Sequence, residues 1–419
     1  MKKTQMKFWG GLNTIGGNII EIRYGNDRII FDFGRHYNPA DVLLSKNARP
    51  EKYVSDMLRL NILPKIDGIY KKQDISQIDI LSVEESSYNT AVFISHLHLD
   101  HVASIDAIHV PIYMSHDSKK MFEQLNKIDE LPLKPSNEIK TFDYNDVIEI
   151  GEIKLTAYQN DHDIIGSCAF FVETPDLKIG YSGDFRMHGK NPHHNENWMK
   201  EMATKKLDYL LIEGTSFFHE TEEKIVTLPI SELEVHNLIK EKLLEDKYKS
   251  GVAFFNIYHR NFDRIEGLVN VAKETKRKIV FEDKTFQLIK GLGKNFDCFK
   301  LSTEIKEINK NPNLYLVQNS FDNVFDLLDF NLENSLYIHS NGVPLGEFDP
   351  AYNSLLSILE ILGVDYAKIQ TSGHADKDAI LQAIDIVKPN CIIPWHSLAP
   401  ENINPTDQKI LMPQLGIWY

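Results

Sequence analysis

The sequence has few cysteines and no long apolar run. Its 419 residues include three cysteines, an odd and sparse number that excludes a disulfide framework. No apolar segment is long enough to span a bilayer. Met1 to Thr4 leads into a predicted strand without the apolar core of a signal peptide, so we expect a cytoplasmic protein with no membrane partner.

The chain also lacks an excess of positive charge. It has 46 Lys and Arg against 60 Asp and Glu, a net charge of −14 and a pI near 5.6. Such a surface argues against broad, nonspecific binding of nucleic acid. A locally positive groove remains compatible with this composition, because divalent cations and a few arginines can reverse the potential of a cleft.

No linker rich in Gly, Ser or Pro divides the chain, and the sequence has no internal repeat or low-complexity segment. The length nevertheless predicts two or three domains. The hydrophobic content of 42% predicts a globular chain with a packed core.

The most informative segment that is present is the string HLHLDH, which begins at His96 and directly follows the apolar run 91–94. His96 and His98 are two residues apart and can face one cation. Asp100 and His101 lie past them and can face another. A polar loop that happens to be rich in His is the alternative, but clusters with this spacing usually bind metal.

Three later predicted strands each lead to a further metal-ligand type. They span 153–158, 177–182 and 391–395, and the ligand types that follow them are His162, Asp184 and His396. Ligands at the ends of rigid strands can converge on one edge of a sheet. We therefore predict two groups of ligands bridged by Asp184, whose carboxylate has two oxygens. The groups are His96, His98 and His162, and Asp100, His101 and His396.

All of these ligands are nitrogen or oxygen donors, which favours zinc, with manganese as the alternative. Two cations about 3.5–4 Å apart activate water and clamp the oxygens of a displacement. Asp100 and Asp184 are therefore predicted to be catalytic as well as metal-binding. The same chemistry suits phosphodiesters, amides, lactones and thioesters, so the metal motif by itself leaves the substrate open.

Asp184 and His396 are far apart in the sequence yet must meet at the predicted site. The segment between them therefore contains an insertion, which we place at 216–369, with 1–215 and 370–419 forming the hydrolase domain. Within it, strands are predicted at 251–255, 278–281, 314–317 and 335–338, and a helix at 263–275. The succession of strand, helix and strand predicts a doubly wound parallel α/β domain.

The connection over 35–90, before the metal motif, is unusually long. Short helices are expected at 56–60 and 75–81. We expect this connection to close one side of the active-site cleft and the inserted domain to close the other.

Together these motifs resemble those of the β-CASP group of metallo-β-lactamase-fold nucleases, and within it most of all ribonuclease J and its smaller bacterial relatives. The matching segments are Gly10–Asn18, Phe31–Gly34, His96–His101, His162, Asp184, Glu213, Asn261–Arg264, Thr371–Ala375 and Pro394–His396. The resemblance implies an α/β fold, a metallo-β-lactamase αββα sandwich with an inserted β-CASP domain. It also implies hydrolysis of nucleic acid, RNA rather than DNA, by 5′-to-3′ exonuclease action, with endonuclease cleavage as the weaker alternative.

The chain departs from this family in two places. Ser397 stands where the family commonly has Gly after the last ligand, and the separate C-terminal domain of ribonuclease J is absent from the sequence. Both departures concern the mode of action and the oligomer, so a homodimer is left open.

The segment Ser372–His374 precedes a predicted helix over 379–387. Free amides and the positive end of that helix attract anions, and Ser372, Gly373 and His374 are predicted to bind a substrate phosphate there. His374 could also donate a proton to the leaving oxygen, which makes it a catalytic candidate. The alternative is ordinary helix capping by Asp376 beside a structural His.

Three arginines are candidates for substrate binding. Arg260 and Arg264 are four apart at a helix start and can grip a phosphate, although a solvated pair is the alternative. Arg186 closely follows Asp184 and is predicted to touch substrate.

Other polar residues are predicted to support the site or to lie away from it. Asp32 and Glu213 are carboxylates that can lie behind the ligands and orient their imidazoles or the Ser372–His374 segment. His188, His193 and His194 belong to a polar stretch and are predicted to lie at the surface.

The sequence thus predicts a two-metal phosphodiesterase that acts on RNA. The rival enzyme is a hydrolase of a small ester, lactone or nucleotide on the same fold, and the insertion and the Ser372–His374 segment argue against it. A rival of another class is a metal- or nucleic-acid-binding protein with an inactive site, and the complete set of ligands argues against that.

Overall fold

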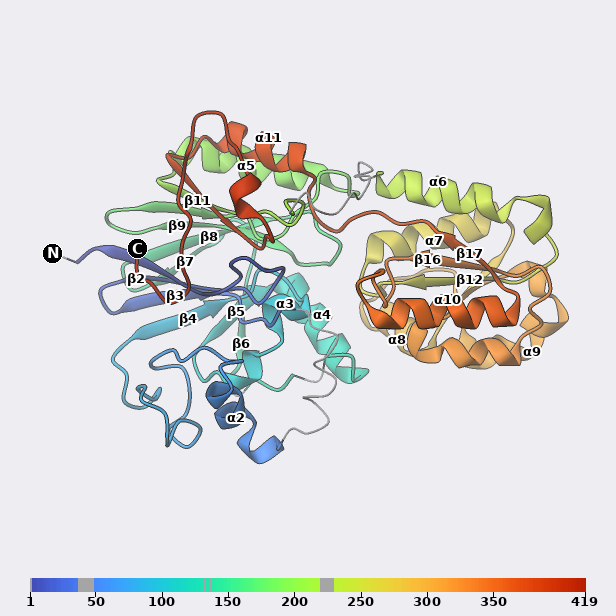
Figure 1. Cartoon of the computed structure of the whole chain (residues 1–419), viewed down its shortest axis with the longest axis horizontal. Coiled ribbons are helices and arrows are strands. Elements are labelled where there is room, and N and C mark those ends of the chain that lie inside the picture. Colours follow the sequence, from blue (N-terminus) through green and yellow to red (C-terminus); the bar gives the residue numbers. More distant parts are fainter. Residues whose placement is uncertain (1, 37–48, 132, 136, 219–229) are drawn as a thin grey trace.

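The computed structural model describes residues 2–36, 49–131, 133–135, 137–218 and 230–419. Figure 1 shows two domains side by side, with both chain termini on the same one. We call the larger one, built from two stacked sheets, the sandwich domain, and the other the inserted domain. In the described part of the chain, no helix is both long and apolar enough to cross a membrane.

The first sheet of the sandwich domain has the strand order β1-β2-β3-β4-β5-β6. Its strands are β1 Thr4–Gly10, β2 Ile19–Tyr24, β3 Asp27–Phe31, β4 Asn89–Phe93, β5 Ile112–Ser115 and β6 Ile139–Phe142. β1 to β3 pair antiparallel, whereas β3 to β6 pair parallel. The parallel pairing brings the carboxyl ends of β3 and β4 to one edge, where the metal motif begins.

The second sheet has the order β19-β18-β11-β10-β9-β8-β7. Its strands are β7 Val147–Ile150, β8 Ile153–Gln159, β9 Cys168–Glu173, β10 Lys178–Tyr181, β11 Tyr209–Glu213, β18 Cys391–Trp395 and β19 Lys409–Ile410. β18 lies parallel to β11, with Glu213 opposite Trp395. The chain therefore leaves this sheet after β11 and returns beside it, as the ligand order predicted.

The two sheets pack face to face through aromatic side chains. The Phe31 ring of the first sheet stacks on Phe170 and Tyr181 of the second, with ring centroids 5.2 and 4.6 Å apart, and within the second sheet Tyr181 stacks on Trp395 at 4.8 Å. Helices cover the outer faces: α4 His116–Lys127 packs on the first sheet, and α5 Pro192–Lys205 and α11 Lys377–Val387 pack on the second. These layers form the predicted αββα sandwich.

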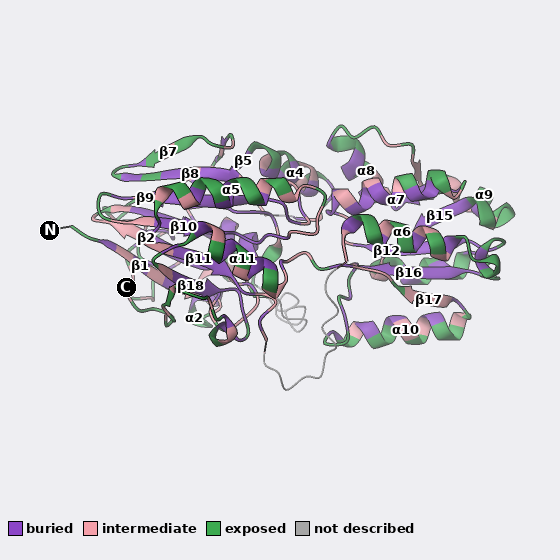
Figure 2. Cartoon of the chain, turned by 90° about the horizontal axis from the view of Figure 1, so that it is seen from above, coloured by how far each residue is buried: buried purple, intermediate pink, exposed green. Residues whose placement is uncertain are grey.

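The sheet of the inserted domain is parallel throughout, in the order β14-β13-β15-β12-β16-β17. Its strands are β12 Ala253–Ile257, β13 Lys278–Phe281, β14 Phe299–Lys300, β15 Tyr315–Gln318, β16 Leu336–Ser340 and β17 Asp365–Lys368. The central strands β12, β13, β15 and β16 are buried on both faces, which explains their largely apolar sequences (Figure 2). All of them lie within the predicted boundaries 216–369, which themselves remain a prediction.

Helices cover both faces of this sheet. One face packs against α6 Glu232–Leu243, α7 Phe262–Glu274 and α8 Asp283–Gly291, and the other against α9 Leu301–Lys310 and α10 Pro350–Leu362. The doubly wound arrangement predicted from the strand and helix patterns is therefore confirmed. The remaining helical segments are η1 Pro50–Lys52, α2 Tyr53–Arg59, α3 Leu99–Val102, η2 Ile105–Ala107, η3 Asp246–Tyr248, η4 Pro312–Leu314, η5 Phe321–Asp329 and η6 Pro400–Asn402.

The long connection before β4 agrees only in part with the expectation. Residues 37–48 lie outside the described residues, and α2 covers 56–59 of the helix expected at 56–60. The helix expected at 75–81 is wrong, because this segment forms successive turns such as Ile78 N–H to Ile75 O. The turns let Ile75 enter the core, whereas an isolated helix this short is unstable.

Candidate metal centre and active site

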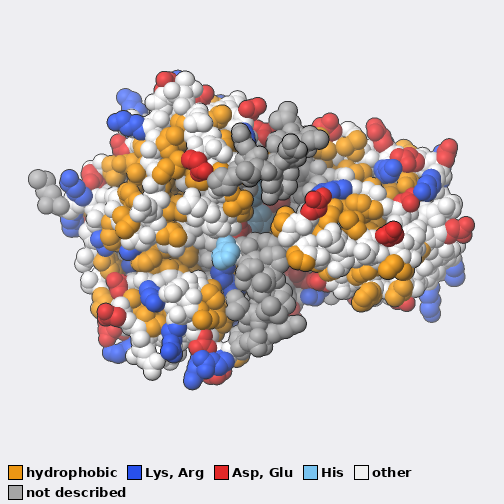
Figure 3. Space-filling model, in the orientation of Figure 1, with side chains coloured by type: hydrophobic (Ala, Val, Ile, Leu, Met, Phe, Trp, Pro, Cys, Tyr) orange, Lys and Arg blue, Asp and Glu red, His pale blue; other side chains and the backbone are white. Residues whose placement is uncertain are grey.

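The predicted ligands meet at the edge of the sandwich domain that faces the inserted domain. They come from the loop after β4, the loop between β8 and β9, the end of β10 and the end of β18. In Figure 1, α3, which carries Asp100 and His101, lies on this side of the sandwich. The space-filling view shows histidine side chains in the hollow between the two domains (Figure 3).

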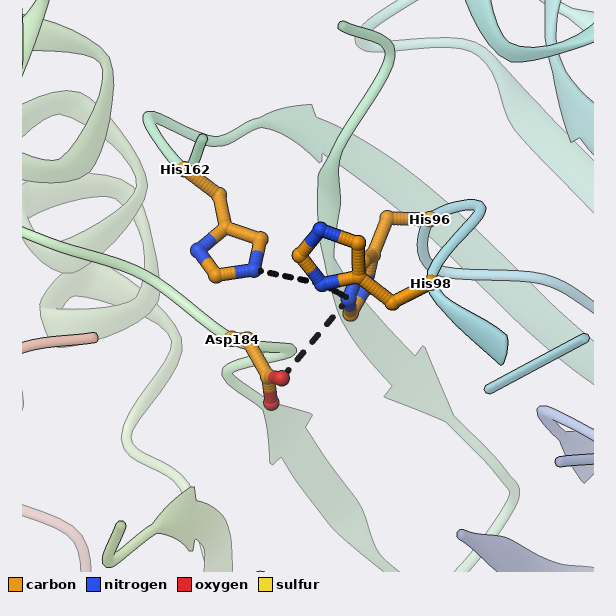
Figure 4. A group of neighbouring side chains, drawn as sticks. All are labelled: His96, His98, His162 and Asp184. Atoms are coloured by element: carbon orange, nitrogen blue, oxygen red, sulfur yellow. Dashed lines mark hydrogen bonds and ion pairs between the residues drawn. The ribbon is translucent and has the colours of Figure 1, made fainter. Parts of the chain in front are cut away.

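The first group contains His96, His98, His162 and Asp184, whose ligand atoms all lie within 4.8 Å of one another. Figure 4 shows the three imidazoles and the carboxylate turned toward one another. His98 Nδ1 lies 3.1 Å from both His96 Nε2 and His162 Nε2. Asp184 Oδ2 lies 3.7 Å from His96 Nε2, so three nitrogens and one oxygen surround a common point.

The second group contains Asp100, His101, Asp184 and His396, again with ligand atoms within 4.8 Å. His101 Nε2 lies 3.0 Å from Asp184 Oδ2, and His396 Nε2 lies 3.0 Å from Asp100 Oδ2. Asp184 therefore belongs to both groups, which is the arrangement a bridging carboxylate requires. Its other oxygen, Oδ1, is buried and has no hydrogen-bond partner among the described residues.

The protonation states of Asp184, His162 and His96 in the first group fit cation binding. Burial raises the pKa of the Asp184 carboxyl, but the surrounding imidazoles outweigh that effect and hold it well below its ordinary value. Burial lowers the pKa of His162 to about 3 and that of His96 well below its ordinary value. These residues therefore offer a carboxylate and neutral imidazoles, the forms that bind divalent metals. The donor set of nitrogen and oxygen fits zinc or manganese.

Asp32 lies directly behind the second group. Its Oδ2 is 2.8 Å from His101 Nδ1 and accepts hydrogen bonds from the Ser95 hydroxyl and the Tyr181 hydroxyl. Its Oδ1 accepts the Ser95 amide. This carboxylate holds the His101 ring so that Nε2 faces Asp184, which is the role of an orienting partner behind a ligand.

Glu213 and Thr215 connect His374 to the ligand His396. Glu213 Oε2 accepts a hydrogen bond from the Thr215 hydroxyl at 2.6 Å and lies 3.1 Å from His374 Nδ1. The Thr215 oxygen lies 2.7 Å from His396 Nδ1. Burial opposes a charge on His374, but Glu213 outweighs it and raises the pKa of His374 to about 10. Because Nδ1 faces Glu213, Nε2 of His374 is the ring nitrogen available to a substrate.

Two imidazoles lie within hydrogen-bond distance of carbonyl oxygens in the Ser372–His374 segment. His162 Nδ1 lies 2.6 Å from Gly373 O, and His188 Nε2 lies 2.8 Å from Ser372 O. His188 is therefore not the free surface residue that its polar sequence suggested, whereas His193 is exposed. The polar stretch gave no sign of this contact, because Ser372 follows His188 by almost half of the chain.

The amino terminus of α11 is capped from within the chain. The Asp376 side chain accepts the Ala379 amide at 2.8 Å, so the capping alternative describes this helix end. The Ser372 hydroxyl accepts the His374 amide at 3.0 Å, and Ser372 itself is exposed. A phosphate near this segment would therefore meet Ser372 and His374 rather than a free helix terminus.

The three predicted substrate arginines are buried, Arg186 and Arg260 between the domains and Arg264 within the inserted domain. Arg264 bonds to Glu232, and Arg186 bonds to Glu232 and Asp263. Arg260 donates to the carbonyl oxygens of Leu97 and Glu130, 3.4 and 2.9 Å away. Their exposed fractions are 1% for Arg264 and Arg186 and 5% for Arg260, so this geometry does not present them to a substrate.

Two further residues at the site were absent from the sequence prediction. Asp163 Oδ1 lies 3.0 Å from His98 Nε2 and 3.5 Å from His162 Nε2, beside the first group. The Tyr258 ring, from the inserted domain, packs edge-on against His98 with centroids 5.3 Å apart. Asp163 could have been noticed beside His162, but no sequence signal connects Tyr258 with His98.

Metal should stabilise the folded protein, because the ligands from His96 to His396 join segments that are distant in the sequence. We expect about 3–4 kcal/mol of added stability when free metal exceeds its dissociation constant by roughly 100–1,000-fold. Melting temperatures measured with Zn²⁺ and with excess chelator test this. Equal melting temperatures under the two conditions would contradict it.

The chain is similar in sequence to known proteins. Residues 81–244 match the family model described as Beta-lactamase superfamily domain. Ribonuclease J of Mycoplasma genitalium is 22% identical over 426 aligned positions, which cover 94% of this chain and 68% of that protein. Endoribonuclease YSH1 of Candida albicans is 27% identical over 237 positions, which cover 49% of this chain and 23% of that protein.

A solved structure matches the whole chain. It is a protein of unknown function from Enterococcus faecalis V583, with a TM-score of 0.83, 27% sequence identity and full coverage of both chains. The similarity therefore extends over the sandwich domain and the inserted domain together.

Proposed function

We propose that this chain, a member of the β-CASP ribonuclease-like group of metallo-β-lactamase-fold proteins, is a metal-dependent phosphodiesterase that hydrolyses RNA in preference to DNA. The observation that carries the proposal is Asp184, shared by two groups of nitrogen and oxygen ligands. His374, held beside both groups by Glu213, adds a proton donor next to the metal site. The resemblance to two ribonucleases makes RNA the substrate to test first.

In the proposed reaction, two divalent cations would supply an activated water at neutral pH and offset the charge of the phosphate. His96, His98 and His162 would hold one cation, and Asp100, His101 and His396 the other, with Asp184 between them. Zinc, with manganese as the alternative, remains our prediction from the donor set.

The chain's own proton donor is His374. Its Nδ1 faces Glu213, which fixes the ring and leaves Nε2 to donate a proton to the leaving oxygen. Glu213 is itself fixed, since its Oε1 accepts the Phe185 amide at 2.9 Å. Ser372, which is exposed, would contact a phosphate on the same side. Cations at the neighbouring groups would lower the pKa of His374 and so favour proton release.

We further propose 5′-to-3′ exonuclease action, with endonuclease cleavage as the weaker alternative. The site lies in the hollow between the two domains, which a free strand end enters more easily than a closed loop (Figure 3). A cytoplasmic location and a homodimer remain predictions from the sequence.

The experiment compares single strands of one sequence as linear 5′-monophosphate, linear 5′-triphosphate and circular RNA, with a linear DNA control. Faster loss of the linear 5′-monophosphate, releasing mononucleotides from its 5′ end, is the expected result. Equal cleavage of all three RNAs into internal fragments would contradict exonuclease action and indicate an endonuclease. Hydrolysis of a small ester without cleavage of any oligonucleotide would favour the small-molecule hydrolase, and failure to bind metal would favour the inactive binding protein.

A further inference from the structure

A buried ionic network joins the two domains close to the metal ligands. The Glu232 carboxylate, at the start of α6, lies between two arginines. Arg186 Nη1 from the sandwich domain is 2.7 Å from Glu232 Oε1, and Arg264 Nε from α7 is 2.8 Å from Oε2. Arg186 Nη2 also reaches Asp263 Oδ2 at 3.1 Å. The Glu232 and Arg186 side chains are only 4% and 1% exposed, so the pair is shielded from solvent.

Arg186 also connects the two loops that carry metal ligands. It follows Asp184 by two residues, and its amide donates to the Asp161 carbonyl at 2.9 Å. Its Nε lies 3.7 Å from Asp161 Oδ1, and Asp161 directly precedes His162. Asn195 of α5 donates to the carbonyl oxygens of both Arg186 and Asp161. Arg186 therefore belongs to the loop that carries Asp184 and is hydrogen-bonded to the loop that carries His162.

The charges in this network favour a fixed geometry. Burial raises the pKa of Glu232, but Arg264 and Arg186 outweigh that effect and lower it to about 2. The carboxylate is therefore ionised near neutral pH and accepts from both guanidinium groups. Buried ion pairs add little net stability compared with apolar packing, but they specify one arrangement of their partners.

We propose that Glu232 and Asp263 of the inserted domain are positioning residues, which act through Arg186 to hold His162 and Asp184 at the distances that metal binding requires. The inserted domain then does more than cover the cleft, because its docking sets the geometry of the first metal group. Arg186 serves as the connector and does not bind substrate. This inference rests on the proposed metal-dependent function.

The test measures metal binding directly. Glu232→Gln leaves two buried arginines without their shared carboxylate, and we expect the affinity of the metal-free protein for Co²⁺ and Zn²⁺ to fall by about 10–100-fold, the usual effect of an orienting group behind a ligand. Affinity is measured by competition with a chelator, and the visible absorption spectrum of the Co²⁺-loaded protein should change. With RNA, kcat should fall while KM changes little.

Glu266→Gln is the matched control. It removes another cross-domain pair, Lys190 Nζ to Glu266 Oε2 at 2.7 Å, in which both side chains are about half exposed. Affinity and Co²⁺ spectrum should equal those of the wild-type protein. If Glu232→Gln fails to fold, Asp263→Asn decides the question, because the Asp263 side chain is 23% exposed and its replacement leaves the Arg264–Glu232 pair intact.

A lower melting temperature with unchanged Co²⁺ affinity and spectrum would overturn the positioning role and leave a purely structural network. That result differs from failure of the proposed function, in which the wild-type protein itself would bind no Co²⁺ and cleave no RNA. A weaker affinity in Glu232→Gln and Asp263→Asn, but not in Glu266→Gln, would support the proposal.

Discussion

Asp184→Asn should abolish hydrolysis of RNA while the fold is kept. Asp184 is the residue common to both ligand groups, and its Oδ2 lies 3.0 Å from His101 Nε2 and 3.7 Å from His96 Nε2. An amide of the same shape removes the negative charge shared by the two proposed cation sites. Turnover should fall by at least about 10³-fold, because the change removes more than a single hydrogen-bond donor, whose loss costs about 10²–10³-fold.

The measurement is the initial rate on end-labelled RNA with added metal, together with metal content and melting temperature. Asp385→Asn, which replaces an exposed carboxylate on α11, is the matched control and should retain wild-type turnover. Unchanged activity in Asp184→Asn would disprove the bridging role. Loss of the folded state would mean that Asp184 is required for the stability of the fold.

His374→Ala should lower turnover by about 10²–10⁴-fold, the scale of a general acid or a phosphate donor. Metal content should stay nearly unchanged, because the hydrogen bonds of His374 go to Glu213 and Thr215. Its ring packs beside the ligands His162 and His396, with centroids 5.1 and 5.2 Å apart, and is not one of the predicted ligands. The measurements are single-turnover rates and bound metal per chain.

His193→Ala, at an exposed position of α5, controls for the loss of an imidazole. A His374→Ala protein that loses metal would show that His374 is a ligand of the group it forms with Asp184, Glu213 and His396. A protein that unfolds would show a structural role. Either outcome would contradict the proposed proton transfer.

Much of the fold was predictable because its signals are local. The apolar runs of β8, β10, β12 and β18 are strands in the structure, and the periodic pattern of α11 is a helix at Lys377–Val387. The expected helix at 75–81 failed because the segment is too short for its pattern to decide between turns and a helix. There the burial of Ile75 determined the conformation.

The arginines show what the local sequence pattern cannot predict. Arg260 and Arg264 do lie four apart at the start of α7, as the sequence indicated. Their partners include Leu97, Glu130 and Glu232, which lie between 32 and 163 residues away in the sequence. The pattern of charges cannot distinguish a guanidinium that faces solvent from one buried against a distant carboxylate. His188, which bonds to Ser372, is a case of the same kind.

By itself, the sequence determined the ligand types, their order along the chain and the need for an insertion that returns to the sheet. These features depend on residue identity and on periodicity within a few residues, which survive without any tertiary contact. Only the tertiary structure decided that Thr215 connects Glu213 with His396 and that Arg186 is buried between the domains. Each of these depends on contacts between segments brought together by packing, and such contacts leave no periodic signal in the chain.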